Sequence, residues 1–278
     1  SATSTGSGTL IDPRGYILTN FHVVGHTRHG DGGVPGTLYT SGDTIRIATV
    51  TSARDTATPR YLGRVVRADV RLDLAIVRIV SNTDGTALAA DATFPTVELT
   101  DTEGVNPGAR VWAFGFPMGV TTINVTGGNI SGFEMSSTRE VAWIRTDVEF
   151  NPGNSGGMLV DRRGRLVAVP TAVVSSDDTL EPIELARPVE RMPAEWRTAL
   201  DAGTAIDAAI ITGVPALSAG AELTDSGTGD AGGMESAEVL YYTLPAERPG
   251  MITITPALPM AIGGPSGEIG REGEGTIP

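Results

Sequence analysis

Residues 151–157 place one serine, Ser155, among three glycines. A serine without bulky neighbours on a sharp turn can present its hydroxyl as a nucleophile. The glycines allow a backbone in which the N–H groups of Gly153 and Ser155 point at one position. Two such donors form an oxyanion hole, which stabilises the negative charge on a tetrahedral intermediate by roughly 3–4 kcal/mol per donor. A plain glycine-rich turn is the alternative interpretation.

A serine hydroxyl is a weak nucleophile unless a base takes its proton, so this chemistry requires a histidine. The chain has three, His22, His26 and His29. His22 follows residues 17–21, where the end of an apolar strand runs into a turn that could hold an imidazole rigidly. Three neighbouring histidines could instead bind a metal. The segment after His22 has no helical period to bring ligands to one face, so we expect no metal site.

An imidazole that acts as a base needs a carboxylate to fix its tautomer and to stabilise its charged form. Asp73 stands at the entry to an apolar strand, where an unpaired carboxylate would be costly. Asp69 is the competing candidate, but it precedes a charged stretch and is expected to be solvated. The sequence therefore favours Asp73.

The elements that must position these residues are short β-type runs separated by turn residues. Many short strands at this spacing indicate a sandwich or a barrel. One helix is expected, at residues 193–202. The predicted strands are residues 8–12, 15–20, 44–52, 61–68, 74–80, 110–115, 122–132, 141–147, 158–161 and 166–174.

The composition narrows the class of protein. The 36 glycines and 18 prolines favour a turn-rich β protein over a helical bundle. No run of 18 apolar residues occurs, so no membrane-spanning helix is expected. Cysteine is absent, which excludes disulfides and thiolate metal sites. The net charge of −13, with arginine as the only strongly basic residue, argues against a nucleic-acid or anionic-membrane partner.

The chain changes character near residue 200. Residues 1–200 carry 22 acidic residues and 18 arginines, whereas residues 201–278 carry 11 acidic residues and 2 arginines. We expect a globular domain at residues 1–200, a linker or long loop at 201–236, and a small β-hairpin with a Gly/Pro-rich tail at 237–278. The predicted hairpin strands are residues 239–244 and 251–255. Because the chain begins at Ser1 without Met or a signal peptide, it is interpreted as a processed or excised piece of a longer product.

Three separated motifs, residues 6–24, 73–79 and 146–160, resemble the HtrA/Deg branch of the trypsin-like serine proteases. Residues 115–119 and 185–189 are similar to further landmarks of that family. The resemblance covers about residues 6–200. It implies an all-β fold of two six-stranded antiparallel β-barrels of chymotrypsin type, with a short C-terminal helix and a β or extended C-terminal appendage.

The resemblance also implies roles for individual residues. His22 matches the general base, Asp73 its orienting carboxylate and Ser155 the nucleophile, with Gly153 and Ser155 as the oxyanion hole. Met158 departs from the family, because a proline usually follows the two glycines. Relatives that are activated by a new N-terminus bind its ammonium group with an aspartate at the position of Asn154. Because Asn154 is neutral, we do not expect this mode of activation here.

The same resemblance predicts the borders of the substrate pocket. Residues 169–174 should pair with the substrate backbone as an added antiparallel strand. Most of the pocket side chains are apolar or small, which favours an aliphatic substrate side chain. Glu149 stands where trypsin carries its selector for basic residues, so a basic preference is the alternative. The predicted pocket residues are Val148, Glu149, Phe150, Thr171, Ala172 and Val173.

Together these features predict a secreted or periplasmic serine endopeptidase that acts on protein or peptide substrates through a Ser155 acyl-enzyme. No cofactor is expected. Two alternatives remain open. One is a binding or assembly protein that keeps the protease fold without turnover, and the other is an autoprocessing protease that cuts only its own precursor. Residues 201–278 are expected to carry no catalytic residue.

Overall fold

The computed structural model describes residues 6–25, 44–117, 122–174 and 182–212, and the backbone of six short strands elsewhere. Residues 213–236 of the predicted linker and the predicted strand at 239–244 lie outside the described residues. The chain divides into two compact units. The first comprises Ser1–His26 and Tyr39–Gly213, and the second comprises Thr27–Leu38 and Val214–Pro278.

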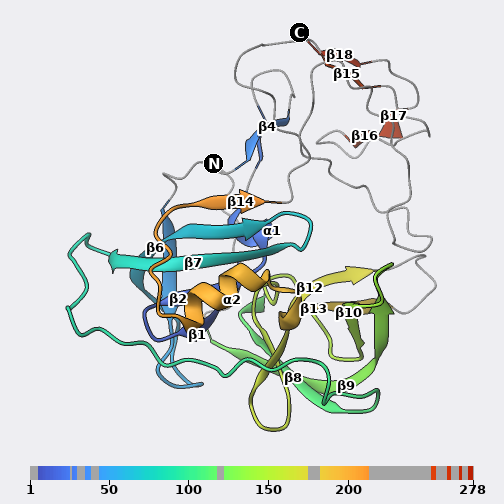
Figure 1. Cartoon of the computed structure of the whole chain (residues 1–278), viewed down its shortest axis with the longest axis horizontal. Helices are drawn as coiled ribbons and strands as arrows, with labels where there is room; N and C mark the ends of the chain where they lie inside the picture. Colours follow the sequence, from blue (N-terminus) through green and yellow to red (C-terminus); the bar gives the residue numbers. More distant parts are fainter. Residues whose placement is uncertain are drawn as a thin grey trace. The chain divides into compact units, whose positions relative to one another are not determined.

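The first unit contains a six-stranded sheet built mostly from the N-terminal third of the chain (Figure 1). Its strand order is β1-β2-β7-β6-β14, and β5 also pairs with β6. All pairs are antiparallel except β14 with β6. The closed barrel implied for this half stays a prediction, because the described strands form an open order. The strands are β1 (Thr9–Asp12), β2 (Tyr16–Thr19), β5 (Ile45–Thr49), β6 (Thr58–Asp69), β7 (Leu74–Asn82) and β14 (Ile210–Thr212).

The second sheet of this unit is a closed six-stranded antiparallel barrel in the order β10-β13-β12-β11-β8-β9. This confirms the prediction of a β-barrel for the second half of the domain. Its core contains the fully buried Val111, Ile144 and Leu159, whose apolar side chains fill the interior. The strands are β8 (Arg110–Gly115), β9 (Asn124–Met135), β10 (Val141–Thr146), β11 (Met158–Val160), β12 (Leu166–Val174) and β13 (Ile183–Pro188).

Every strand predicted up to residue 174 overlaps an observed one, whereas β13 and β14 were not predicted. The helical elements named within the described residues are α1 (Phe21–Val24), the 3-10 turn η2 (Val189–Arg191) and α2 (Ala194–Asp201). The last lies within the predicted helix at 193–202. Within the described part of the chain, no helix is long and apolar enough to cross a membrane.

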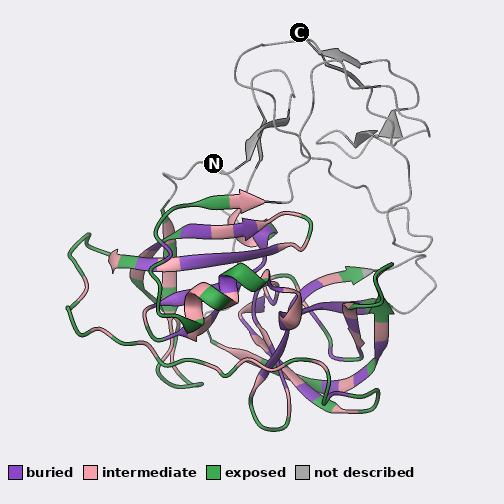
Figure 2. Cartoon of the chain, viewed as in Figure 1, coloured by how far each residue is buried: buried purple, intermediate pink, exposed green. Residues whose placement is uncertain are grey.

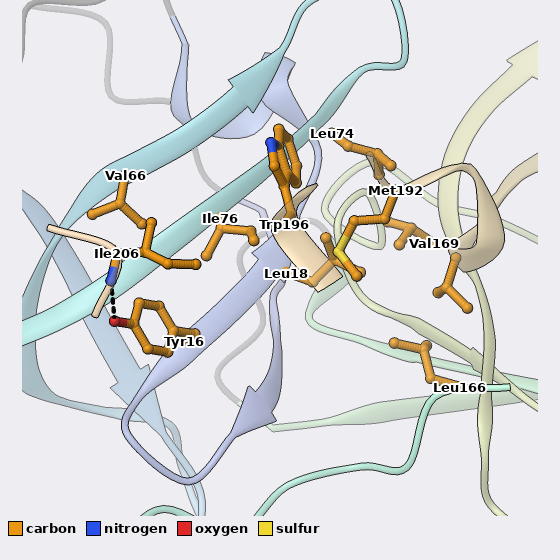
Figure 3. Close-up of a cluster of buried hydrophobic side chains, with 11 residues drawn as sticks. Tyr16, Leu18, Val66, Leu74, Ile76, Leu166, Val169, Met192, Trp196 and Ile206 are labelled. Carbon is orange, nitrogen blue, oxygen red and sulfur yellow. Dashed lines mark hydrogen bonds between the residues drawn. The ribbon is translucent and has the colours of Figure 1, made fainter. Parts of the chain in front are cut away.

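One apolar cluster joins the two sheets (Figure 3). Leu18 and Leu74 from the first sheet pack in the same cluster as Leu166 and Val169 from the barrel strand β12. Trp196 of α2 is buried among them. Figure 2 shows buried residues along the strands of both sheets. Shared burial of large side chains, each worth about 1.5–3 kcal/mol, therefore fixes the two sheets against each other.

The second unit is described only by three antiparallel strand pairs. The predicted strand at 251–255 corresponds to β15, whose partner is β18. His29 lies in β3, and His26 lies outside the described residues. The pairs are β3 (Thr27–His29) with β4 (Pro35–Leu38), β15 (Ile252–Ile254) with β18 (Gly275–Ile277), and β16 (Ile262–Gly263) with β17 (Ile269–Gly270).

Candidate active site

His22 and Asp73 form a close pair although 51 residues separate them in the chain. The imidazole Nδ1 lies 2.6 Å from Asp73 Oδ2, and the backbone N–H of His22 donates to Oδ1 at 2.9 Å. The carboxylate therefore holds both the ring and the main chain of His22. A carboxylate at Nδ1 favours the tautomer with the proton on that nitrogen, which leaves Nε2 with a free lone pair. Nε2 can thus accept a proton.

The backbone of Asp73 is held in an unusual conformation at the start of β7. Its φ of 52° is in the left-handed region, which costs a non-glycine residue about 1–2 kcal/mol. The Asp73 carbonyl accepts hydrogen bonds from Asn20 Nδ2 at 2.8 Å and from the Phe21 N–H at 3.2 Å. These bonds to the two residues before His22 keep the strained turn in place.

Asp69, the competing carboxylate, has a different role in the structure. Its Oδ1 accepts the Leu72 N–H at 3.0 Å, and its Oδ2 accepts the Thr212 hydroxyl at 3.1 Å. It therefore closes the turn that leads to Asp73 and ties this turn to β14. The side chain is half-buried rather than fully solvated as the sequence suggested.

A buried arginine supports the same turn from the barrel. Arg187 of β13 is 6% exposed, and its Nε donates to the Leu72 carbonyl at 2.8 Å. Nη1 donates to the Ala142 carbonyl at 2.8 Å, and the guanidinium lies 3.4 Å from the centre of the Trp143 ring. Burial lowers the pKa of Arg187 to about 10, against the opposing effect of Asp73. Sequence reasoning missed it, although a charged residue inside the apolar run 185–189 was the available signal.

Ser155 lies on the tight turn between β10 and β11. Gly153 and Gly156 adopt φ values of 103° and 81°, which glycine tolerates and other residues rarely do. The Gly156 N–H donates to the Pro170 carbonyl at 3.0 Å, which anchors the turn to β12. Within the described residues, the N–H groups of Gly153 and Ser155 donate no hydrogen bond. Both remain available to an oxygen of a ligand.

The Ser155 turn packs against the end of β2, directly before the helix α1 that carries His22. A Cβ on Gly156 would collide with Thr19 Oγ1 and lie 3.2 Å from the Asn20 nitrogen. A Cβ on Gly6 would lie 2.6 Å from the Val23 side chain and 3.2 Å from the Ser155 carbonyl oxygen. The hydrogen bonds of the described residues join His22 to Asp73 but include none between His22 and the Ser155 hydroxyl.

Ser7 holds the turn in place from the other side. Its N–H donates to the Ser155 carbonyl at 2.9 Å, and its hydroxyl donates to the Gly153 carbonyl at 2.6 Å. The same hydroxyl accepts the Phe116 N–H at 2.9 Å. The main chain on both sides of Asn154 is therefore fixed.

A cavity of about 190 Å³ opens beside Ser155. Of the six predicted pocket residues, four line it. Val148 is instead fully buried in the barrel core, and Glu149 is exposed with its Oε1 3.3 Å from Asn151 Nδ2. The lining residues are Phe150, Asn151, Pro152, Ser155, Pro170, Thr171, Ala172 and Val173.

A closed β-barrel packed on a second sheet, with a serine turn beside a histidine–aspartate pair, defines the class of trypsin-like β proteins. The chain belongs to the trypsin-like peptidase domain family, whose pattern matches residues 6–169. This confirms the HtrA/Deg resemblance, since relatives and solved structures of that branch also match.

Two comparisons illustrate the similarity. A protein of Marinomonas sp. (strain MWYL1), described as a probable periplasmic serine endoprotease DegP-like, is 31% identical over 187 residues. The match covers 66% of this chain and 33% of the relative, so the chain spans about a third of the length of the curated relatives. The solved structure "HtrA-type protease AlgW with tripeptide" is 30% identical with a TM-score of 0.51, covering 72% of this chain and 57% of the other.

Proposed function

We propose that this chain is a serine endopeptidase that hydrolyses protein or peptide substrates through an acyl-enzyme on Ser155. The observation that carries the proposal is the 2.6 Å contact between His22 Nδ1 and Asp73 Oδ2. A carboxylate that fixes an imidazole is the arrangement that turns a neighbouring hydroxyl into a nucleophile. Membership of the trypsin-like peptidase family supports the same activity.

In the first step, Ser155 Oγ attacks the carbonyl carbon of the scissile peptide bond while its proton passes to His22 Nε2. The carbonyl oxygen becomes an oxyanion, which the N–H groups of Gly153 and Ser155 stabilise. Asp73 stabilises the imidazolium. The imidazolium then protonates the leaving nitrogen, the C–N bond breaks, and the acyl group stays on Ser155.

In the second step, water replaces the leaving amine. His22 takes a proton from the water, whose oxygen attacks the acyl carbon, and a second tetrahedral intermediate forms in the same oxyanion hole. Its collapse breaks the ester bond and returns the proton to Ser155 Oγ. The products are a free carboxylic acid and the unchanged enzyme, so no cofactor takes part.

The substrate backbone would pair with β12. Residues 172–174 of β12 pair with β13 on one edge, whereas β11 pairs only with Leu166 and Ala168 on the other. The second edge of Ala172 and Val173 is thus left without a strand partner among the described residues. An extended peptide can add there as an antiparallel strand, with its side chain entering the cavity beside Ser155.

The proposal places the protein outside the cytoplasm, either secreted or periplasmic. The descriptions of the DegP-like relatives as periplasmic support this location. The structure of the similar protein AlgW contains a tripeptide, which supports a peptide as the class of ligand.

Labelling with a fluorophosphonate tests the proposal, because this probe phosphonylates only an activated serine. The chain should gain one adduct, seen by intact mass, and Ser155→Ala should gain none. Ser137→Ala, which changes an exposed turn serine of the barrel, is the matched control and should label fully. A folded chain that never labels would favour the binding protein without turnover, and a label that survives in Ser155→Ala would refute the assigned nucleophile.

A further inference from the structure

The barrel strand β13 carries a buried acid that the proposed mechanism does not use. Glu184 is 7% exposed, and its Oε2 has no hydrogen-bond partner among the described residues. Buried carboxylates are normally paired, because an isolated charge in a protein interior is unfavourable. The position of Glu184 therefore needs an explanation.

The neighbours of Glu184 place it behind the cavity that adjoins Ser155. It pairs with Val173 of β12, and directly paired residues point to the same face of a sheet. Val173 lines the cavity. The backbone N–H of Phe150 lowers the pKa of the Glu184 carboxylate, and Phe150 lines the cavity as well. The carboxylate thus lies next to two residues of the cavity wall.

Among the described residues, no cation compensates the charge of this carboxylate. Burial raises the pKa of Glu184 to about 7, the hydrogen bond from Phe150 opposes this rise, and the negative charge of Glu149 adds to it. The pairing partner on β10 is the neutral Thr146, and the partner on β12 is the apolar Val173. A positive group entering the cavity would supply the missing charge.

We propose that Glu184 determines the specificity of this pocket, which takes the long cationic side chain of a lysine or arginine from the substrate. The proposal rests on the proposed function for the identity of the ligand as a substrate residue. The apolar surfaces of Phe150, Pro152 and Pro170 would hold the methylene stem, and Glu184 would bind the charged end from the pocket side. This differs from the aliphatic preference expected from the sequence.

Glu149, the acid that the sequence pointed to, does not fit this role. Its side chain is exposed to solvent, and its Oε1 accepts a hydrogen bond from Asn151 Nδ2 at 3.3 Å. Glu149 and Glu184 therefore form a matched pair for the test. Replacing either by glutamine removes one negative charge, but only Glu184 lies buried behind the pocket.

Binding of benzamidine, a small planar cation, tests the proposal without hydrolysis. Calorimetry at pH 8 would use the full chain with Ser155→Ala, and uncharged benzamide is the matched ligand. We expect benzamidine to bind at least about tenfold more tightly than benzamide. Adding Glu184→Gln should remove this difference, and adding Glu149→Gln should keep it, with near-UV circular dichroism confirming that each variant is folded.

Two results would overturn the assignment: equal benzamidine affinity with and without Glu184→Gln, or no preference for benzamidine in the parent. Both results come from binding measurements that do not depend on catalysis, so a failure of Ser155 to label with fluorophosphonate would contradict the proposed function and not the binding result. In the active chain, peptides cleaved after lysine or after its uncharged analogue norleucine provide the second readout. The ratio of their kcat/KM values should fall about tenfold in Glu184→Gln and stay unchanged in Glu149→Gln.

Discussion

Arg187 donates a 2.8 Å hydrogen bond from Nε to the carbonyl of Leu72, the residue directly before Asp73. This bond joins a barrel strand to the turn that carries the carboxylate of the proposed catalytic pair. Because Nη1 of the same guanidinium also binds the Ala142 carbonyl, Arg187 links three segments of the chain. We regard it as a positioning residue.

Arg187→Met should therefore lower both stability and activity. Two part-buried carbonyls would lose their donors, at about 1–3 kcal/mol each, so we expect the free energy of unfolding to fall by about 3 kcal/mol. Misplacement of Asp73 should lower kcat more than it raises KM. Urea unfolding and peptide kinetics check both effects. Arg163→Met, an exposed turn arginine, is the control, and equal behaviour of the two variants would contradict the positioning role.

Gly156→Ala should disrupt the Ser155 turn. An added Cβ would need the left-handed backbone and would also collide with Thr19 Oγ1 and the Ser7 carbonyl. Gly164→Ala is the matched control, since Gly164 has a φ of 76° but nothing within 4 Å of the new Cβ. We expect the free energy of unfolding to fall by about 1 kcal/mol in Gly164→Ala and by at least about 3 kcal/mol in Gly156→Ala. Gly156→Ala should also lose acylation of Ser155. Similar melting temperatures for both variants would show that the close packing is unimportant.

The stability difference between Glu184→Gln and the parent should depend on pH. The folded pKa of Glu184 is raised to about 7 from 4.5, so the folded state keeps a proton that the unfolded chain releases. This contribution to stability is complete below pH 4.5 and is lost as pH rises through 7. The parent therefore loses about 3 kcal/mol of its free energy of unfolding between pH 4.5 and pH 8, a loss that Glu184→Gln should not show. Urea titrations at both pH values measure it, and a pH-independent difference would refute the raised pKa.

The strands of the first 174 residues could be predicted because each is a local run of β-forming residues ended by turn residues. β14 could not, because Ile210–Thr212 is a strand only through parallel pairing with β6, some 140 residues away. The closed order of the second sheet likewise depends on long-range pairs such as β10 with β13. Local patterns carry no information on such partners.

The candidate site shows the same division. His22, Asp73 and Ser155 could be proposed from the sequence because each stands in a distinctive local motif. Val148 was expected at the pocket, but its side chain alternates into the barrel core while Glu149 points to solvent. Glu184 and Arg187 escaped notice because the sequence does not show which buried carbonyl, ring or cavity a charged side chain on β13 will meet.

The central claim is that Asp73 and His22 activate Ser155, and the most direct test is the acylation rate of two matched aspartate variants. Asp73→Asn should slow fluorophosphonate acylation by roughly 10⁴-fold, because the amide favours the wrong imidazole tautomer. The matched change four residues before Asp73 is Asp69→Asn, in which the amide oxygen can still accept the Leu72 N–H. This variant should react within about threefold of the rate of the parent chain. Equal rates for Asp73→Asn and the parent chain, or a comparable loss in both variants, would contradict the account.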